Sequence, residues 1–217
     1  FAATASWSAP GHELWHPSPQ FYYLNGAGPL FDMGPYYLTA LIFLLGPVTK
    51  VIGNSTRSNR NRKVHTGDLA ETPITVEVET HISALLTHQS GAQSTIMVSF
   101  EVWAARLPRI EVYGTEGTIS VPDPNMFSDE VQIYTSDNRE WKVVPASAGY
   151  KEAGRGFGLA DMAIAIDKNQ PHRASGDLAF HVLEIMESIL KSAKGDQRIT
   201  MKSTVAQPQK VPFSSLT

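Results

Sequence analysis

The feature that most constrains the fold of this chain is a change in the spacing of its apolar residues. From Ile74 to Val144, apolar and polar residues alternate, and short runs of turn-forming residues interrupt the alternation. A period of two is typical of strands, because successive side chains of a strand point to opposite faces of a sheet. We therefore predict a series of antiparallel strands at residues 74–86, 94–104, 109–113, 118–121, 131–134 and 140–144.

Helical spacing is found on both sides of this region. Pro29 to Leu45 carries apolar residues three and four positions apart, and the Gly46-Pro47 pair after it is typical of a helix end. A longer helix near the C-terminus has Ser175 as its N-cap. The other predicted elements are helices at 157–168 and 175–194, and strands at 1–8, 48–54 and 199–201.

These elements predict an α+β fold, an open, predominantly antiparallel sheet with helices packed on one face. The 217 residues suit one domain of this kind. A sheet covered on one face leaves the other face to a partner. We expect Trp103, Ile82 and Phe100 on that free face, and we expect it to bind a second copy of the chain.

Composition excludes several classes of function. The chain has no cysteine, which excludes disulfides, thiolate zinc sites and a cysteine nucleophile. Its net charge is −3, and the densest basic segment, Arg57 to Lys63, contains no aromatic residue, so we interpret it as a solvated loop. The apolar run from Tyr36 to Pro47 is too short to span a bilayer. We expect a cytoplasmic protein that binds neither nucleic acid nor membrane.

One run has the spacing of a metal-binding motif, whereas motifs for dinucleotide or serine chemistry are missing. Residues 12–16, His-Glu-Leu-Trp-His, have the HExxH spacing, but they lie in the loop predicted before the first helix rather than on a helix, so we predict no metal site. The glycine-containing runs at 26–29 and 154–158 do not follow a strand, and the first contains a proline in place of a backbone donor. We therefore expect no cofactor-binding residue within this chain. No Gly-x-Ser-x-Gly elbow is present either.

Three segments, in the same order, resemble the C-terminal domain of the Gfo/Idh/MocA oxidoreductases: residues 11–46, 111–127 and 156–195. The resemblance covers nearly the whole chain. It implies that residues 1–217 form the substrate-binding and dimerisation domain of an NAD- or NADP-dependent enzyme. Because the chain starts with Phe1 in a predicted strand, we expect it to be a fragment that lacks the N-terminal Rossmann domain, which would bind most of the cofactor. The resemblance also implies a homodimer or a dimer of dimers through the sheet, and we expect the fragment alone to be inactive.

The family's Asp-x-Gly-x-His-x-x-Asp signature matches residues 32–39. Asp32 and Gly34 agree with it, whereas Tyr36 and Thr39 replace the histidine and the second aspartate. In the family, that histidine is often the acid/base partner of the substrate hydroxyl. A tyrosine can take this role when a nearby cation, such as the family's N-terminal lysine, stabilises its ionised form. We predict that Tyr36 and Asp32 are catalytic; the alternative is that Asp32 caps the helix and Tyr36 belongs to the core.

Four further residues are candidates for substrate binding. His16, Tyr22 and Tyr23 lie in an aromatic-rich loop before this helix, and His172 precedes the last helix. Aromatic faces beside hydroxyl-binding groups suit a sugar ring, although packing of the loop would explain the same residues. The predicted function is hydride transfer between NAD(P) and a hydroxylated small molecule such as a sugar or polyol. The alternative is a non-catalytic sugar-binding or scaffolding protein that self-associates through its sheet.

Overall fold

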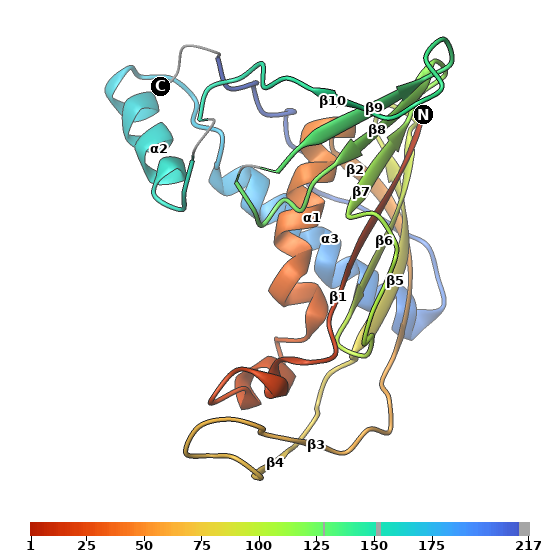
Figure 1. The fold of residues 1–217 in the computed structure, drawn as a ribbon, viewed down its shortest axis with the longest axis vertical. Coiled ribbons are helices and arrows are strands. Elements are labelled where there is room, and N and C mark those ends of the chain that lie inside the picture. The colour runs from red at the N-terminus through yellow and green to blue at the C-terminus, as the bar shows by residue number, and fades with distance from the viewer. Residues whose placement is uncertain (128, 151–152, 213–217) are drawn as a thin grey trace.

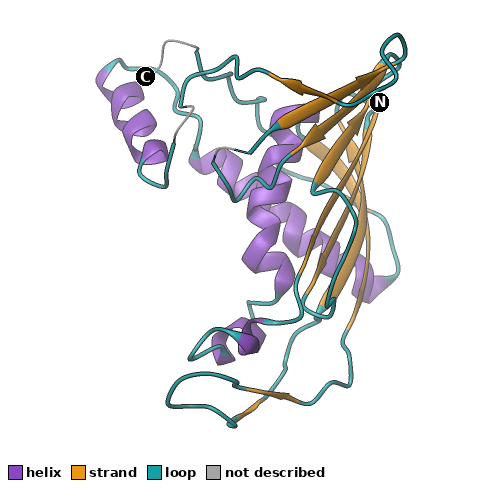
Figure 2. Cartoon of the chain, in the orientation of Figure 1, coloured by secondary structure: helices purple, strands orange, loops and turns teal. Residues whose placement is uncertain are grey.

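The computed structural model describes residues 1–127, 129–150 and 153–212, and it consists of a curved sheet with helices on one side (Figures 1 and 2). The helices are α1 (Pro29–Leu45), α2 (Phe157–Asp167) and α3 (Gly176–Gly195), with two short 3₁₀ turns, η1 (His12–Leu14) and η2 (Gln20–Tyr23). The strands of the large sheet are β1 (Ala2–Ser8), β2 (Val48–Thr56), β5 (His81–His88), β6 (Gln93–Ser99), β7 (Ile110–Tyr113), β8 (Gly117–Val121), β9 (Val131–Thr135), β10 (Lys142–Val144) and β11 (Ile199–Thr200). A separate ribbon pairs β3 (Arg62–Lys63) with β4 (Pro73–Ile74).

The nine strands follow the order β10-β9-β8-β7-β1-β6-β5-β2-β11. Every pair is antiparallel except β1 with β6, which run parallel. Helices α1 and α3 cover one face of the sheet, and the opposite face carries no helix of the described chain (Figure 2). The predicted α+β class, with an open and mostly antiparallel sheet, is confirmed.

Helix α1 begins and ends where its local sequence requires. Pro29 occupies the first helical position, where the missing N–H would have no helical acceptor in any case. Gly46 follows the last turn with a φ of 87°, a value that favours glycine, and its N–H donates to the carbonyl of Ile42. The buried face of α1 includes Leu38 and Leu41, both 0% exposed. The sequence prediction for this helix is confirmed at both ends.

Two glycines let the last helix approach its neighbours closely. A Cβ added to Gly34 of α1 would lie 3.2 Å from the sulfur of Met186 in α3. A Cβ added to Gly53 of β2 would overlap the carbonyl oxygen of Ile189, also in α3. The N–H of Gly53 donates to the hydroxyl of Ser192 at 2.8 Å. Helix α3 is therefore fixed against both α1 and β2, and the main apolar core lies between the two helices and the sheet.

Alternate residues of each strand face the helices, so odd and even residue numbers fall on opposite faces of the sheet. In β5 the even-numbered residues are buried, so Ile82 is 2% exposed and belongs to the core. Phe100 is fully buried in a second apolar cluster, and the prediction that Ile82 and Phe100 lie on the free face is wrong. Trp103 is 69% exposed but lies in the loop after β6. The free face of the central strands carries Ile52 and Leu85, which are cross-strand partners.

The predicted strand at 74–86 is wrong in its first half. Ile74 ends the small ribbon, and β5 begins only at His81. Between them the backbone bonds to the loop before α1, as the N–H of Glu77 does to the carbonyl of Tyr23 at 2.8 Å. The alternation here arises because Ile74 is buried and Val76 half-buried against the second cluster, not because the segment pairs with a strand. Residues 75–80 thus run past the start of α1 before β5 begins.

Candidate functional site

The candidate site lies where the first turns of α1 meet η1 and η2, at the lower end of the molecule in Figure 1. Asp32 and Tyr36 are one turn apart on α1, and residues at this spacing share a face of a helix. Asp32 lies in the first turn, where the helix dipole stabilises a negative charge. Among the described residues, the only hydrogen bond of its side chain is to His12, so the carboxylate does not cap the helix. The carboxylate therefore remains available to other groups.

One of those groups is His12, a residue that sequence reasoning missed. Its Nε2 lies 2.7 Å from Oδ2 of Asp32, and the two side chains are 8% and 23% exposed. The imidazole packs edge-on or tilted against aromatic rings, with centroid distances from 4.2 Å for Tyr22 to 6.0 Å for Trp7. Twenty positions separate His12 from Asp32, and no spacing in the sequence links them.

Tyr22 completes the polar group around Asp32. Burial raises the pKa of Tyr22, and the negative charges of Asp32 and of ionised Tyr36 raise it further. The three side chains are therefore close enough to interact electrostatically, although they come from η2 and α1. At neutral pH Tyr22 keeps its proton, so its hydroxyl can donate a hydrogen bond, and its ring packs 4.2 Å from that of His12, the partner of Asp32.

His16 lies in the same aromatic cluster as Tyr22. Its ring packs 5.3 to 5.6 Å from the rings of Trp15, Phe21 and Tyr22, and its Nδ1 accepts a hydrogen bond from the N–H of Ser18. Trp15 and Phe21 are 59% and 52% exposed. The structure thus brings together two predicted substrate-binding residues, His16 and Tyr22, and Tyr22 in turn packs against His12, the partner of Asp32.

Tyr23 lies apart from this group. It is fully buried, its hydroxyl donates to Glu13, and it accepts a hydrogen bond from the N–H of His12 at 3.2 Å. Burial raises the pKa of Tyr23 well above its usual value, and the hydrogen bond to Glu13 adds to the shift. A side chain with no exposed surface has no atom to offer a substrate. Tyr23 contributes to the support of the site instead.

That support is a buried network around Arg62. Its Nη1 lies 2.5 Å from Oε1 of Glu13, and its Nη2 lies 2.7 Å from Oε1 of Glu101. Nη2 also donates to the carbonyl of Phe100 at 3.0 Å. The network ties η1, which carries His12, to the β3–β4 ribbon and to the end of β6. The interpretation of Arg57 to Lys63 as a solvated loop is therefore wrong for Arg62, which is 5% exposed because the ribbon places it against η1.

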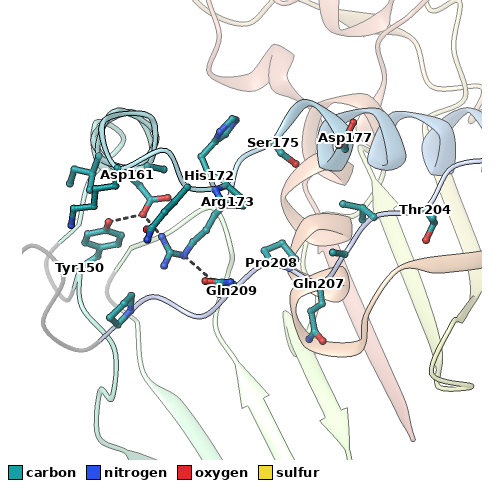
Figure 3. Close-up of a pocket in the computed structure, with 18 residues that line it drawn as sticks. Tyr150, Asp161, His172, Arg173, Ser175, Asp177, Thr204, Gln207, Pro208 and Gln209 are labelled. Atoms are coloured by element: carbon teal, nitrogen blue, oxygen red, sulfur yellow. Dashed lines mark hydrogen bonds and ion pairs between the residues drawn. The ribbon is translucent and has the colours of Figure 1, made fainter.

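His172 lies in a different cavity, of about 990 Å³, between α2, the start of α3 and residues 204–212 (Figure 3). Arg173 there forms an ion pair with Asp161, which also accepts a hydrogen bond from the hydroxyl of Tyr150 at 2.8 Å. The neighbouring part of α3 packs at the C-terminal end of α1, where Nε2 of His181 accepts from the N–H of Val48. A helix of 17 residues is roughly 25 Å long, so this cavity lies far from Asp32 at the other end of α1.

The HExxH run of residues 12–16 does not form a metal site, because Nε2 of His12 lies against Asp32 and the carboxylate of Glu13 pairs with Arg62. Within residues 1–127, 129–150 and 153–212, no three histidine, aspartate or glutamate side chains are grouped so that they could hold a metal ion. None of the helices in these ranges is both long and apolar enough to cross a membrane.

Comparisons with known proteins place the chain in a family. The GFO/IDH/MocA C-terminal domain pattern matches residues 1–120. Among solved structures, levoglucosan dehydrogenase in complex with NADH has a TM-score of 0.73 at 17% identity, covering 93% of this chain and 58% of that chain. An NAD binding oxidoreductase from Klebsiella pneumoniae has a TM-score of 0.70 at 22% identity, covering 92% and 58%. Aldose-aldose oxidoreductase from Caulobacter crescentus, complexed with glycerol, has 0.67 at 18%, covering 92% and 55%.

These structures agree with the chain in fold, and the chain spans less than two thirds of the length of each of them. No curated protein matches it. The family pattern covers more than half of the 217 residues and includes the first turns of α1, where Asp32 and Gly34 agree with the family signature. The chain belongs to the GFO/IDH/MocA C-terminal domain family.

Proposed function

We propose that the chain is the substrate-binding C-terminal domain of an NAD- or NADP-dependent oxidoreductase that oxidises a hydroxyl group of a sugar, polyol or related small molecule. A separate Rossmann domain of the same protein would hold most of the cofactor. The observation that carries the proposal is the grouping of Asp32, His12 and Tyr22 beside the exposed ring of Phe21, with Tyr36 one turn along α1 from Asp32. The names of similar structures, levoglucosan dehydrogenase and aldose-aldose oxidoreductase, support the substrate class.

The residues near α1 fit an alcohol substrate. Asp32 would accept a hydrogen bond from a substrate hydroxyl, and Tyr22 would donate one to a neighbouring substrate oxygen. Tyr36, ionised beside a cation of the other domain, would take the hydroxyl proton as the hydride passes to NAD+ or NADP+. The exposed rings of Trp15 and Phe21 offer apolar faces to the C–H groups of a sugar.

The same residues do not form a dinucleotide site. The glycines before α1, Gly26 and Gly28, follow η2 rather than a strand, and Pro29 supplies no N–H to a phosphate. NAD or NADP, bound mainly by the other domain, would supply the acceptor for the hydride. This chain would bind and orient the alcohol and move its proton.

The Tyr36→Phe substitution tests the enzymatic proposal in the full-length protein. It should lower kcat/KM at least about 10²-fold with NAD+ or NADP+ and a panel of sugars, because the acid/base group is lost while the ring remains. Tyr134→Phe, on β9 of the sheet, is a matched control and should retain full activity. Unchanged turnover in Tyr36→Phe would remove Tyr36 from the chemistry.

A second candidate is a non-catalytic sugar-binding or scaffolding protein. The specific observation in its favour is that Tyr36 and Thr39 replace the histidine and aspartate of the family signature. Both proposals predict sugar binding, so cofactor binding separates them. A full-length protein that binds sugars by calorimetry but neither NAD+ nor NADP+ would support the second candidate.

We also propose that the chain forms a homodimer, or a dimer of dimers, through the free face of the sheet. Ile52 and Leu85 are adjacent on that face and are 39% and 38% exposed. Leu85→Lys should shift the mass measured by light scattering towards the monomer. Leu69→Lys is the control, since Leu69 is 41% exposed but lies between β3 and β4. A monomeric unsubstituted protein at micromolar concentration would contradict the proposal.

A further inference from the structure

We propose that His12 is a positioning residue for Asp32: it holds one carboxylate oxygen with its Nε2–H and so directs the other oxygen towards the substrate. The predicted effect of His12 on catalysis rests on the proposed function, whereas the predicted position of the proton on its ring does not. Neither the family signature around α1 nor the predictions from sequence include His12.

The first step is the geometry of the carboxylate. The distance of 2.7 Å between Nε2 of His12 and Oδ2 of Asp32 is typical of a hydrogen bond to an ionised acceptor. No other hydrogen bond to the Asp32 side chain is formed by the described part of the chain. Asp32 is also partly exposed, at 23% of its side chain. His12 therefore holds Oδ2, and Oδ1 is available to a ligand.

The second step assigns the proton on the ring. Nδ1 of His12 is buried and has no hydrogen-bond partner among the described residues. The rings of Trp7, Tyr22 and Phe100 pack around the imidazole at 4.2 to 6.0 Å between centroids. A proton on Nδ1 would point into apolar surroundings without an acceptor, which is unfavourable. The proton therefore belongs on Nε2, where Asp32 accepts it.

The third step is the rigidity of the ring. The N–H of His12 donates to the hydroxyl of Tyr23 at 3.2 Å, and the next residue, Glu13, is held by Arg62. Both Tyr23 and Glu13 are 0% exposed. The backbone that carries the imidazole is thus anchored in the interior on both sides of the peptide. An anchored donor can select a single orientation of the carboxylate, whereas a mobile one cannot.

Two substitutions at residue 12 separate positioning from packing in the full-length protein. The amide nitrogen of glutamine can stand where Nε2 stands, whereas that of asparagine reaches only as far as Nδ1. His12→Gln should therefore retain kcat within about fivefold, the effect of one altered hydrogen bond. His12→Asn should lower kcat about 10²-fold, the effect of a misplaced catalytic group, with a smaller change in KM. Equal losses in the two variants, or none, would overturn the inference.

A measurement without turnover completes the test. Nitrogen-15 NMR of full-length protein labelled at histidine distinguishes the two nitrogens, and the His12→Gln spectrum identifies the signals of His12. We expect the neutral form with its proton on Nε2, and a proton on Nδ1 would overturn the inference whatever the activity. If the unsubstituted protein oxidises no sugar but shows the expected signals, the enzymatic proposal fails and the His12–Asp32 pair stands.

Discussion

Replacing Arg62 with methionine should lower the free energy of unfolding by about 3 to 5 kcal/mol. The side chains of Arg62 and Glu13 are each 1% exposed, so removal of the guanidinium leaves the carboxylate of Glu13 buried. The remaining cation, Arg60, has its Nη2 3.5 Å from that carboxylate and is itself 24% exposed, so it compensates only in part. Urea denaturation measures the change, with the same m-value (the slope of the unfolding free energy against urea concentration) used for both proteins.

An exposed ion pair in the same ribbon is the matched control for Arg62. Lys63 pairs with Glu71, and their side chains are 49% and 73% exposed. Lys63→Met should therefore cost at most about 1 kcal/mol. If the two variants lose similar stability, the buried network does not hold η1 in place. Adding Glu13→Gln to Arg62→Met should recover part of the loss, because the unpaired charge is then gone.

The helices could be predicted because their signals are local. The spacing of apolar residues, Pro29 at the start and Gly46 after the end define α1 within a single segment. Ser175 likewise accepts the hydrogen bond of the Leu178 N–H at the start of α3, as an N-cap should. Asp32 and Tyr36 could be paired from the sequence for the same reason, since a separation of four residues places both on one helix face.

The failures share another physical cause. The alternation of apolar and polar residues indicates which side chains are buried, but it does not indicate which segment the backbone forms hydrogen bonds with. The segment after Ile74 therefore looks like a strand although its backbone bonds to the loop before α1. His12 and Arg62 reach the site through η1 and the small ribbon, and contacts between segments so far apart leave no periodic signal. Gly11, next to His12, marks the place in the sequence with a residue suited to an unusual backbone.

Replacing Gly11 with alanine should lower the free energy of unfolding by at least about 2 kcal/mol, through strain and overpacking together. Gly11 has a φ of 114° and a ψ of 150°, a region that residues with a Cβ rarely adopt. A Cβ at this position would also overlap the carboxylate of Glu13 and Nη1 of Arg62, which are packed against each other. The added methyl group would therefore strain the backbone and separate the buried ion pair.

Gly91→Ala isolates the backbone part of this effect. Gly91 has a φ of 86°, and a Cβ there would meet no atom within 4 Å. This variant should lose only the strain of a positive φ, about 1 to 2 kcal/mol. The Gly11 variant should also change the nitrogen-15 signals of His12, because His12 follows Gly11 directly and depends on the Glu13 anchor. Equal losses in the two alanine variants, with unchanged His12 signals, would show that the buried network tolerates the methyl group and does not determine where the imidazole meets Asp32.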